Sequence, residues 1–597
     1  MSKKRSEIDD KNKWDLSSIF KDSNSFKEEY KNVLIELRNL NIIKENIFSD
    51  STNLLNYLKQ TEKLERRIYK LYYYAHLNFD SDTLNNEYQE NKEKIENLIT
   101  EYSSITSFFE PLLLKEDYSK IMNFCNENKE LSIYKFKFEE LFRFKEHILD
   151  EKTENLLSKF SKTLELPENI YDIFIDGDLK FGTFKDNNNQ DIELNDSNYS
   201  IYIKSDNRII RKNAFELMFK TYSNYGNTIS SIYRANVENL ELISKLRNFN
   251  SSIESSLFND NISIEIYDNL INTVEKNLDP LYKYYNLKKQ ILSLDEIHLY
   301  DVYAPLIKNS NKKYTFSEGK ELVIKALEVL GKDYINIINK AFIEKWIDIY
   351  HNDGKRSGAY SSGFYDTKPY VLLNYENSLN DVSTLAHELG HSCHTYLSCK
   401  NNEYIYSNYK IFVAEVASTV NELLLSKYML KISKDKEEKL TILNSLLELF
   451  RTTIYRQTMF AKFEKEMCEL NSKGEVLTKE VISNNYYEIV KKYFGKDVIC
   501  DELIKYEWER IPHFYYNFYV YKYAIGLSCA CYIVENILNK KENALENYIK
   551  FLSSGASDYP SSLLKIAGID ISSSEVIESA IKMFDNTLEE FKTLYYS

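Results

Sequence analysis

The segment His387-Glu388-Leu389-Gly390-His391 constrains the fold of this chain more than any other feature. On an α-helix, side chains four residues apart lie on one face, so the imidazoles of His387 and His391 can point to one place. Neutral imidazole is a good zinc ligand, and zinc prefers about four nitrogen, sulfur or oxygen ligands. Glu388 lies one residue round the helix, where it can act on a zinc-bound water without binding the metal. The motif therefore predicts two metal ligands and the general base of a metallohydrolase.

Chance rarely produces such a motif in a chain of this composition. The sequence holds 8 His and 91 acidic residues among 597, so a His-acid-x-x-His segment is expected about 0.02 times at random. The flanking residues Val382, Leu385, Ala386 and Leu389 are apolar. They favour a packed helix over a surface helix with two incidental histidines.

The third metal ligand must come from another part of the chain. In metzincins a Gly and a His follow the second motif histidine, but His394 and Leu397 occupy those positions here. The alternative is a glutamate on a following helix. Residues 410–430 are apolar nearly all round, as in a buried helix, and Glu415 lies in the middle of this segment. A buried carboxylate is costly unless it is paired or binds a metal, so we expect Glu415 to be the third ligand. Pairing with a core Lys or Arg is the alternative.

Three neighbouring residues have less defined roles. Glu422 lies two turns beyond Glu415. It can either contact one of the metal ligands without binding the metal or lie on the surface, and the sequence favours neither. His394 is more typical of a packed or hydrogen-bonded histidine than of a fourth ligand. Cys393 points away from the face of His387 and His391, so we expect a small buried side chain there.

Composition bounds the fold class and the partners. A chain of 597 residues with only 14 Gly and 7 Pro is expected to be mainly α-helical and to contain more than one subdomain. A net charge of −14 argues against nucleic-acid binding. No apolar stretch of about 18 residues predicts a membrane span, and no apolar segment follows the first charged residues as in a signal peptide. The seven cysteines suit reduced thiols, so we expect a cytoplasmic protein.

Along the chain, residues 1–203 are predicted to form an N-terminal helical region and residues 204–597 the catalytic domain. Residues 186–203 are polar and predict a hairpin or loop. The short run Pro369–Tyr375 predicts a strand, which is our candidate for the edge to which an extended peptide adds; a purely structural ribbon is the alternative. Asn517 is predicted to cap a helix that ends near Leu538.

Several motifs together resemble a known family. They are Lys355–Tyr360, Pro369–Tyr375, the segment around His387 and Phe412–Thr419, with further similarity at Trp14–Phe20 and Ile511–Tyr515. The chain resembles oligoendopeptidase F, a branch of the thimet oligopeptidase family of zinc peptidases. The resemblance implies two helical lobes around a substrate channel, and a thermolysin-like core with a small β-ribbon. It also implies one zinc ion per chain and short peptides as substrates, because a narrow channel excludes folded proteins.

The segment Pro512–Tyr523 contains His513, the only histidine after residue 394, among many tyrosines. Peptide hydrolysis passes through a tetrahedral oxyanion, which phenol and imidazole donors stabilise. The resemblance places such donors here, although the glycine pair that precedes them in the thimet branch is missing. We expect His513 and at least one of Tyr516, Tyr519 and Tyr523 to act on the transition state. Aromatic core packing is the alternative for each tyrosine.

These observations predict a zinc endopeptidase that uses Glu388 as general base and binds no organic cofactor. A carboxypeptidase or dipeptidase on the same core is the alternative within enzymes. A catalytically silent peptide-binding scaffold is the alternative from another class. The complete set of His387, Glu388, His391 and Glu415 argues against the scaffold.

Overall fold

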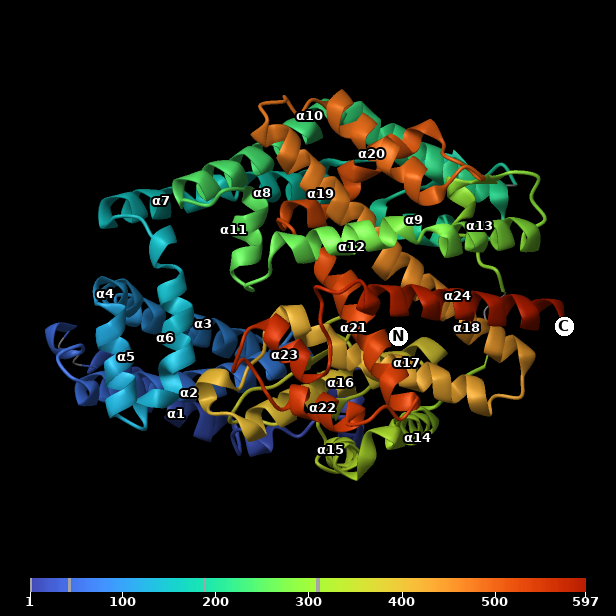
Figure 1. Ribbon diagram of the computed structural model, residues 1–597. Coiled ribbons are helices and arrows are strands. Elements are labelled where there is room, and N and C mark those ends of the chain that lie inside the picture. Colours follow the sequence, from blue (N-terminus) through green and yellow to red (C-terminus); the bar gives the residue numbers. More distant parts are fainter. Residues whose placement is uncertain (1–2, 41–43, 187, 308–311) are drawn as a thin grey trace. The chain divides into compact units, whose positions relative to one another are not determined.

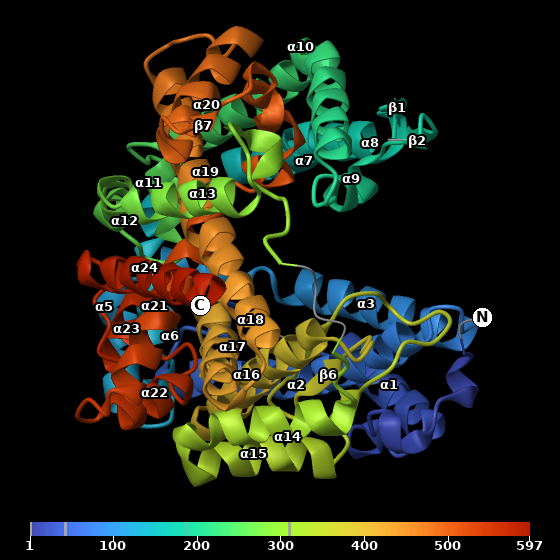
Figure 2. The same ribbon diagram turned by 90° about the vertical axis from the view of Figure 1, so that its right-hand side faces the viewer.

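The computed structural model describes residues 3–40, 44–186, 188–307 and 312–597 (Figures 1 and 2). It confirms a mainly helical protein with a few short strands. Its contacts divide the chain into two compact units, each assembled from three segments: unit 1 comprises Met1–Glu146, Lys312–Tyr428 and Ile533–Gly568, and unit 2 comprises His147–Asn311, Met429–Tyr532 and Ile569–Ser597. The predicted division of the sequence into an N-terminal region, residues 1–203, and a catalytic domain, residues 204–597, stays a prediction.

Unit 1 carries the His387 motif on a long helix, α16. The α-helices that lie wholly in this unit are α1 (Ser23–Arg38), α2 (Ser51–Ser81), α3 (Asn86–Thr106), α4 (Phe109–Lys115), α5 (Tyr118–Glu127), α6 (Lys135–Arg143), α14 (Phe316–Leu327), α15 (Gly331–Ile343), α16 (Leu379–Asn401), α22 (Ala544–Leu552) and α23 (Pro560–Ile566). Helices α14 and α15 both pack on α16 (Figure 2).

The first three helices of unit 1 form a layer around α2. Asp22 caps α1 and Asp50 caps α2, each by accepting a backbone N–H of the first turn. One stripe of α2, which includes Ile68 and Leu71, is completely buried against α1 and α3. Burying each such side chain contributes about 1.5–3 kcal/mol, so the spacing of apolar residues along α2 holds the three helices together.

A three-stranded sheet lies beside the motif helix in unit 1. Strand β6 (Tyr370–Leu372) is central: it pairs in parallel with β4 (Ile347–Asp348) and antiparallel with β5 (Tyr360–Ser362). All of β6 is buried, whereas β5 is half-buried and packs on α16. The predicted strand at 369–375 is therefore confirmed as β6, but its predicted place at the edge is wrong, because β5 is the edge next to the motif helix.

Buried charges fix this sheet to the N-terminal segment. Asp348 in β4 is completely buried and accepts hydrogen bonds from Arg5 Nη1 at 2.8 Å and Lys355 Nζ at 2.7 Å. Burial works to raise the pKa of Asp348, but the two cations outweigh it and the pKa is lowered. Trp14 packs edge-on against Tyr370 at 6.1 Å between ring centroids. These contacts tie β4 and β6, the two strands on the side away from the β5 edge, to the N-terminal segment.

Unit 2 consists mainly of helices packed around the long helix α10. Its α-helices are α7 (Glu151–Leu164), α8 (Leu166–Ile173), α9 (Asp196–Tyr202), α10 (Arg208–Leu246), α11 (Ser252–Phe258), α12 (Ile264–Lys276), α13 (Asp279–Ile291), α18 (Lys436–Phe450), α19 (Arg456–Ser472), α20 (Lys479–Phe494) and α24 (Glu575–Tyr596). The hairpin of β1 (Thr183–Lys185) and β2 (Asp191–Glu193) confirms the predicted hairpin, although α9 follows within residues 186–203. Strands β3 (Ile297–His298) and β7 (Val498–Ile499) pair in parallel.

Two helices, α17 (Ile411–Ile432) and α21 (Tyr521–Leu538), have residues in both units. Helix α21 ends where the sequence predicted, but it begins at Tyr521. Asn517 does not cap it and instead has a left-handed backbone, with φ of 49°. Within the part of the chain that the structure describes, no helix is both long enough and apolar enough to cross a membrane.

Candidate metal centre

Helix α16 has one buried face and one face that carries the two motif histidines. The helix begins with a capping box in which Ser378 N–H donates to Asp381 at 2.8 Å and Asp381 N–H donates to Ser378 Oγ at 3.1 Å. Leu385 and Leu389 are completely buried. The side chains of His387 and His391 keep 25% and 16% of their surface exposed. Four-residue spacing therefore places both imidazoles on a face that a ligand can reach.

Gly390 lets α17 approach α16 closely. A Cβ at this position would lie 2.6 Å from Ser418 Cα and 2.7 Å from Ala417 O, both in the backbone of α17. No other residue fits this contact without moving a helix. Asn421 also ties the helices together, because its side chain donates to Ala386 O at 3.0 Å. The motif glycine thus sets the distance from which α17 presents its acidic side chains.

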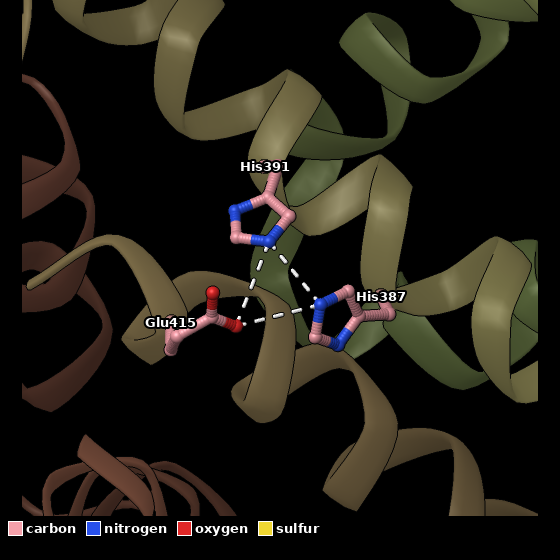
Figure 3. Close-up of side chains that lie close together, drawn as sticks. All are labelled: His387, His391 and Glu415. Carbon is pink, nitrogen blue, oxygen red and sulfur yellow. Dashed lines mark hydrogen bonds and ion pairs between the residues drawn. The ribbon is translucent and has the colours of Figure 1, made fainter. Parts of the chain in front are cut away.

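Three potential ligand atoms converge between the two helices (Figure 3). His387 Nε2 and His391 Nε2 are 3.2 Å apart. Glu415 Oε2 lies 3.4 Å from His387 Nε2 and 3.6 Å from His391 Nε2. All three ligand atoms lie within 4.8 Å of one another, and two imidazoles with one carboxylate are a donor set that zinc prefers. The structure therefore brings together the three residues that the sequence predicted as ligands.

Glu422 lies behind this cluster and orients His387. Its Oε1 is 2.7 Å from His387 Nδ1, which turns Nε2 toward His391 and Glu415. Burial works to lower the pKa of His387, but the hydrogen bond and charge of Glu422 outweigh it and raise the pKa to about 9. Of the two positions that the sequence left open for Glu422, the structure supports the one behind the ligands.

Glu388 is 6% exposed and lies next to the edge strand β5. The backbone N–H of Ser361 hydrogen-bonds to its carboxylate, while Glu388 Oε2 has no hydrogen-bond partner among the described residues. Burial raises the pKa of Glu388 to about 7. The hydroxyls of Ser361 and Ser392 are 2.8 Å apart, so β5 is fixed to α16 at this point. Sequence reasoning missed Ser361, whose only signal was its place in a Gly-rich segment before the motif.

His394 and Cys393 pack inside unit 1 and lie outside the cluster of ligand atoms. The ring of His394 stacks on Tyr409 with centroids 3.7 Å apart and is completely buried. Burial lowers the pKa of His394 to about 3, so the imidazole is neutral. Cys393 is also completely buried. Both residues lie where the sequence predicted them, as packed side chains.

In unit 2, the segment from His513 to Tyr523 separates into buried and accessible side chains. Phe514, Tyr515 and Tyr521 belong to the core. Tyr516 is 45% exposed, and the other predicted donors are half-buried. The ring of His513 lies 5.6 Å from that of Tyr516 and 6.2 Å from that of Tyr523, and Tyr519 lies 5.4 Å from Tyr523. These four side chains therefore form one cluster, and their catalytic role stays a prediction.

An unusual backbone turn holds this cluster, and the sequence did not reveal it. Asn517 and Phe518 both have positive φ, 49° and 60°, although neither is glycine. The carboxylate of Glu464 on α19, completely buried, accepts the N–H of Phe518 at 3.0 Å. The side chain of Asn236 donates to Asn517 Oδ1 at 3.2 Å. The sequence does contain a signal for Glu464: it is an acid that lies between the apolar residues Phe460 and Met467 on one face of its helix.

Comparison with known proteins shows the family to which the chain belongs. The family model described as peptidase family M3 matches residues 201–583, and one described as Oligopeptidase F matches residues 113–181. The oligopeptidase PepF of Bacillus subtilis is 40% identical over 590 residues, covering 99% of this chain and 88% of that protein.

Solved structures agree with these sequence matches. The crystal structure of a peptidase from Chlamydophila abortus has a TM-score of 0.94 and 36% identity, with 100% of both chains covered. An oligoendopeptidase-F structure from Enterococcus faecium has a TM-score of 0.73 and 31% identity, covering 96% of this chain and 99% of that chain.

With these matches, the converging imidazoles and carboxylate define a metalloendopeptidase, and the chain belongs to peptidase family M3. Within this family, full-length relatives that are 35–40% identical to the chain include oligopeptidase PepF and an oligoendopeptidase F homologue, and the Oligopeptidase F model matches residues 113–181, so the chain belongs with the oligoendopeptidase F group. A metallopeptidase requires a metal, and the His387, His391 and Glu415 cluster is where the described residues can hold one.

Proposed function

We propose that this protein is a zinc-dependent endopeptidase that hydrolyses internal bonds of short oligopeptides. The observation that carries the proposal is the convergence of two imidazoles and the Glu415 carboxylate beside Glu388, a buried acid with one unpartnered oxygen. One zinc ion per chain would be held by His387, His391 and Glu415. Bound zinc supplies Lewis-acid polarisation of the scissile carbonyl and of the attacking water.

Glu388 is the general base of the proposed reaction. Its free oxygen takes a proton from the attacking water, and the carboxylic acid then gives that proton to the leaving amine. The burial of Glu388 and its one unpartnered oxygen suit both steps, because the proton taken from the water can be held and returned at the same atom. The backbone N–H of Ser361 favours the charged form of this carboxylate.

We further propose that the peptide adds to the outer side of β5 in an extended conformation. Strand β5 is an edge strand, and it contacts α16, the helix that carries His387 and His391. A substrate strand paired with this edge would bring its backbone past Glu388. This arrangement replaces the predicted edge at 369–375 and leaves the proposed chemistry unchanged.

His513 and at least one of Tyr516, Tyr519 and Tyr523 are proposed to donate hydrogen bonds to the transition-state oxyanion. The support is chemical: the four side chains cluster, they are accessible, and imidazole and phenol groups are suitable donors. A narrow channel that restricts substrates to short peptides belongs to this proposal, as does a cytoplasmic location. The location is supported by Cys125, Cys393, Cys399, Cys468, Cys500 and Cys529, which form no disulfide within the described part of the chain.

The test is to purify the protein, measure zinc per chain and follow cleavage of a mixed peptide library by mass spectrometry. We expect about one zinc per chain, cleavage at internal bonds and loss of activity with a chelator. Glu388→Gln should keep its zinc and lose about 10²–10⁴ in turnover, because the base is removed and the ligands remain. Glu376→Gln, an exposed acid just before α16, is the matched control.

Two results would contradict the proposal. Wild-type turnover in Glu388→Gln would show that Glu388 is not the general base. Release of single residues or dipeptides from one end of every peptide would instead indicate an exopeptidase.

A further inference from the structure

A cavity of about 780 Å³ lies inside unit 1, next to the end of the motif helix. Its walls come from α2, from the end of α3 and the start of α4, from the segment around α6, from residues 363–365 and from residues 395–409. A volume of this size is typical of a site for a small ligand or a few residues of a peptide. The proposed reaction does not use the cavity, so its walls must indicate what it binds.

The cavity begins one helical turn beyond the metal ligands. Thr395 and Cys399 line it, and they follow His387 and His391 at four-residue intervals along α16. Gly363 and Phe364, which directly follow β5, line it too. A Cβ on Gly363 would lie 3.0 Å from Thr395 Cγ2, so the chain leaving β5 touches α16 at the entrance. A peptide paired with β5 would therefore be directed along this wall.

Three acids line the cavity, Glu62 and Glu65 of α2 and Glu110 of α4, and the two on α2 have phenol partners. Glu62 accepts a hydrogen bond from the Tyr134 hydroxyl at 2.7 Å, and Glu65 accepts one from Tyr404. Within the described part of the chain, neither carboxylate forms an ion pair. The cation beside them, Arg66, is held by both oxygens of Asp366 at 2.9 and 2.7 Å. Lys137, the one cation that lines the cavity among the described residues, is exposed.

Aromatic rings form much of the remaining wall. Phe364 stacks on Tyr69 and on Tyr73, each at 5.5 Å between centroids, and meets Tyr404 edge-on at 5.6 Å. Such faces attract ammonium and guanidinium groups. Phenols that already donate to the carboxylates leave the outer carboxylate lone pairs for a further donor. Carboxylates and aromatic faces together select a cation and disfavour an anion.

We propose that this cavity is a subsite that binds a positively charged group of the peptide substrate, either the terminal ammonium or a Lys or Arg side chain. The inference rests on the proposed peptidase function and names a substrate preference for it. A strand advances about 3.3 Å per residue, so Phe364 lies about 10 Å beyond Ser361, the residue that contacts Glu388. The bound cation therefore lies about three or four residues from the cleaved bond.

The first experiment scans a single lysine through a set of otherwise neutral internally quenched peptides. Each peptide is made with a free and with an acetylated amino terminus, and norleucine replaces lysine in the matched neutral peptide. We expect kcat/KM to rise about tenfold when the cation is three or four residues from the cut. A rise that survives acetylation assigns the site to a side chain, and one that acetylation removes assigns it to the terminal ammonium. No dependence on charge at any position would overturn the proposal.

The second experiment tests the residues. Glu62→Gln, Glu65→Gln and the double variant should bring the ratio of kcat/KM for the cationic and neutral peptides close to one. Glu28→Gln, an exposed acid on α1, is the control and should keep the wild-type ratio. Equal losses on both peptides with an unchanged ratio would mean that the acids only support the fold.

A binding measurement separates this inference from the peptidase function. Fluorescence anisotropy with labelled peptides on Glu388→Gln reports the affinity without cleavage. If the wild-type protein cleaves nothing, the proposed function fails, while tighter binding of the cationic peptide, lost on Glu65→Gln, still supports the subsite. If cleavage is normal and affinity does not depend on the cation, the subsite alone is wrong.

Discussion

The metal cluster of unit 1 and the His513 segment of unit 2 are built in opposite ways. In unit 1, the three candidate ligands lie on two regular helices whose spacing is set by Gly390, so the position of each candidate ligand follows from helix geometry. In unit 2, the candidate donors surround a turn with two left-handed residues, which the buried carboxyl group of Glu464 holds in place. The first arrangement is local and regular, and the second depends on tertiary contacts.

This difference predicts how the two regions respond to change. When one ligand side chain is removed from the cluster on the helices, the backbone conformation should stay the same. The substitution should therefore lower the affinity for the metal. A strained turn costs about 1–3 kcal/mol per residue in an unfavourable conformation, and it persists only while its surroundings hold it. Mutations in the second region should therefore affect stability as well as chemistry, and the two effects must be measured separately.

The largest effect is expected from removing a metal ligand. His391→Ala and Glu415→Ala should each lose zinc and at least about 10³ in turnover, because several kcal/mol of charge stabilisation disappear with the metal. Glu422→Gln should cost less, about 10–100-fold in metal affinity, since it only orients His387. Zinc content and turnover are measured together, with Glu376→Ala as control. Full metal occupancy in Glu415→Ala would remove this residue from the ligands.

A smaller effect is expected at the donors of unit 2. His513→Ala and Tyr→Phe at 516, 519 or 523 should reduce turnover about 10²–10³-fold for a true donor, with KM nearly unchanged. Tyr225→Phe, a partly exposed tyrosine elsewhere in unit 2, is the control. Zinc content and melting temperature are measured on the same samples. If the turnover of all three Tyr→Phe variants stays within about twofold of the wild-type value, the tyrosine assignment is wrong. If His513→Ala unfolds or loses zinc, His513 is structural.

The same contrast explains what the sequence could predict. The positions of three residues could be predicted from the sequence. His387 and His391 are four residues apart on one helix, and Glu415 is an isolated acid on an apolar helix. The structure brings all three together. Glu422 could not be placed, because periodicity does not show which neighbour its side chain meets. The predicted cap at Asn517 is wrong because Asn517 and Phe518 form a left-handed turn instead. Glu464, which accepts the N–H of Phe518, lies 54 residues before it in the sequence.

The strand error has a physical signal that the prediction overlooked. Tyr370-Val371-Leu372 is a continuous apolar run, which is typical of a strand buried on both faces. Its neighbour Tyr360–Ser362 is more polar and forms the edge. Which strand is central also depends on pairing with Ile347–Asp348, a distant segment. Local patterns could therefore indicate a strand but could not give its position in the sheet.

The smallest and most specific effect is expected from the residue that holds the turn in unit 2. Burial raises the pKa of Glu464 to about 8, so in the folded protein this group keeps its proton at neutral pH. The unfolded chain loses that proton near pH 4.3, the ordinary value of a glutamate. Between about pH 4.3 and 8 the folded state binds the extra proton, and the free energy of unfolding therefore decreases as the pH rises through this window.

Glu464→Gln should remove this pH dependence while keeping an oxygen that accepts the N–H of Phe518. Relative to wild type, its melting temperature should be similar at pH 5 and progressively higher as the pH approaches 8. Glu475→Gln, an exposed acid in the same unit, should show no such trend. The measurement is thermal unfolding of the three proteins at pH 5, 6, 7 and 8. A variant that is equally destabilised at every pH would mean that the turn needs a carboxyl group as such. Parallel curves for Glu464→Gln and wild type would show that Glu464 does not change its protonation on folding.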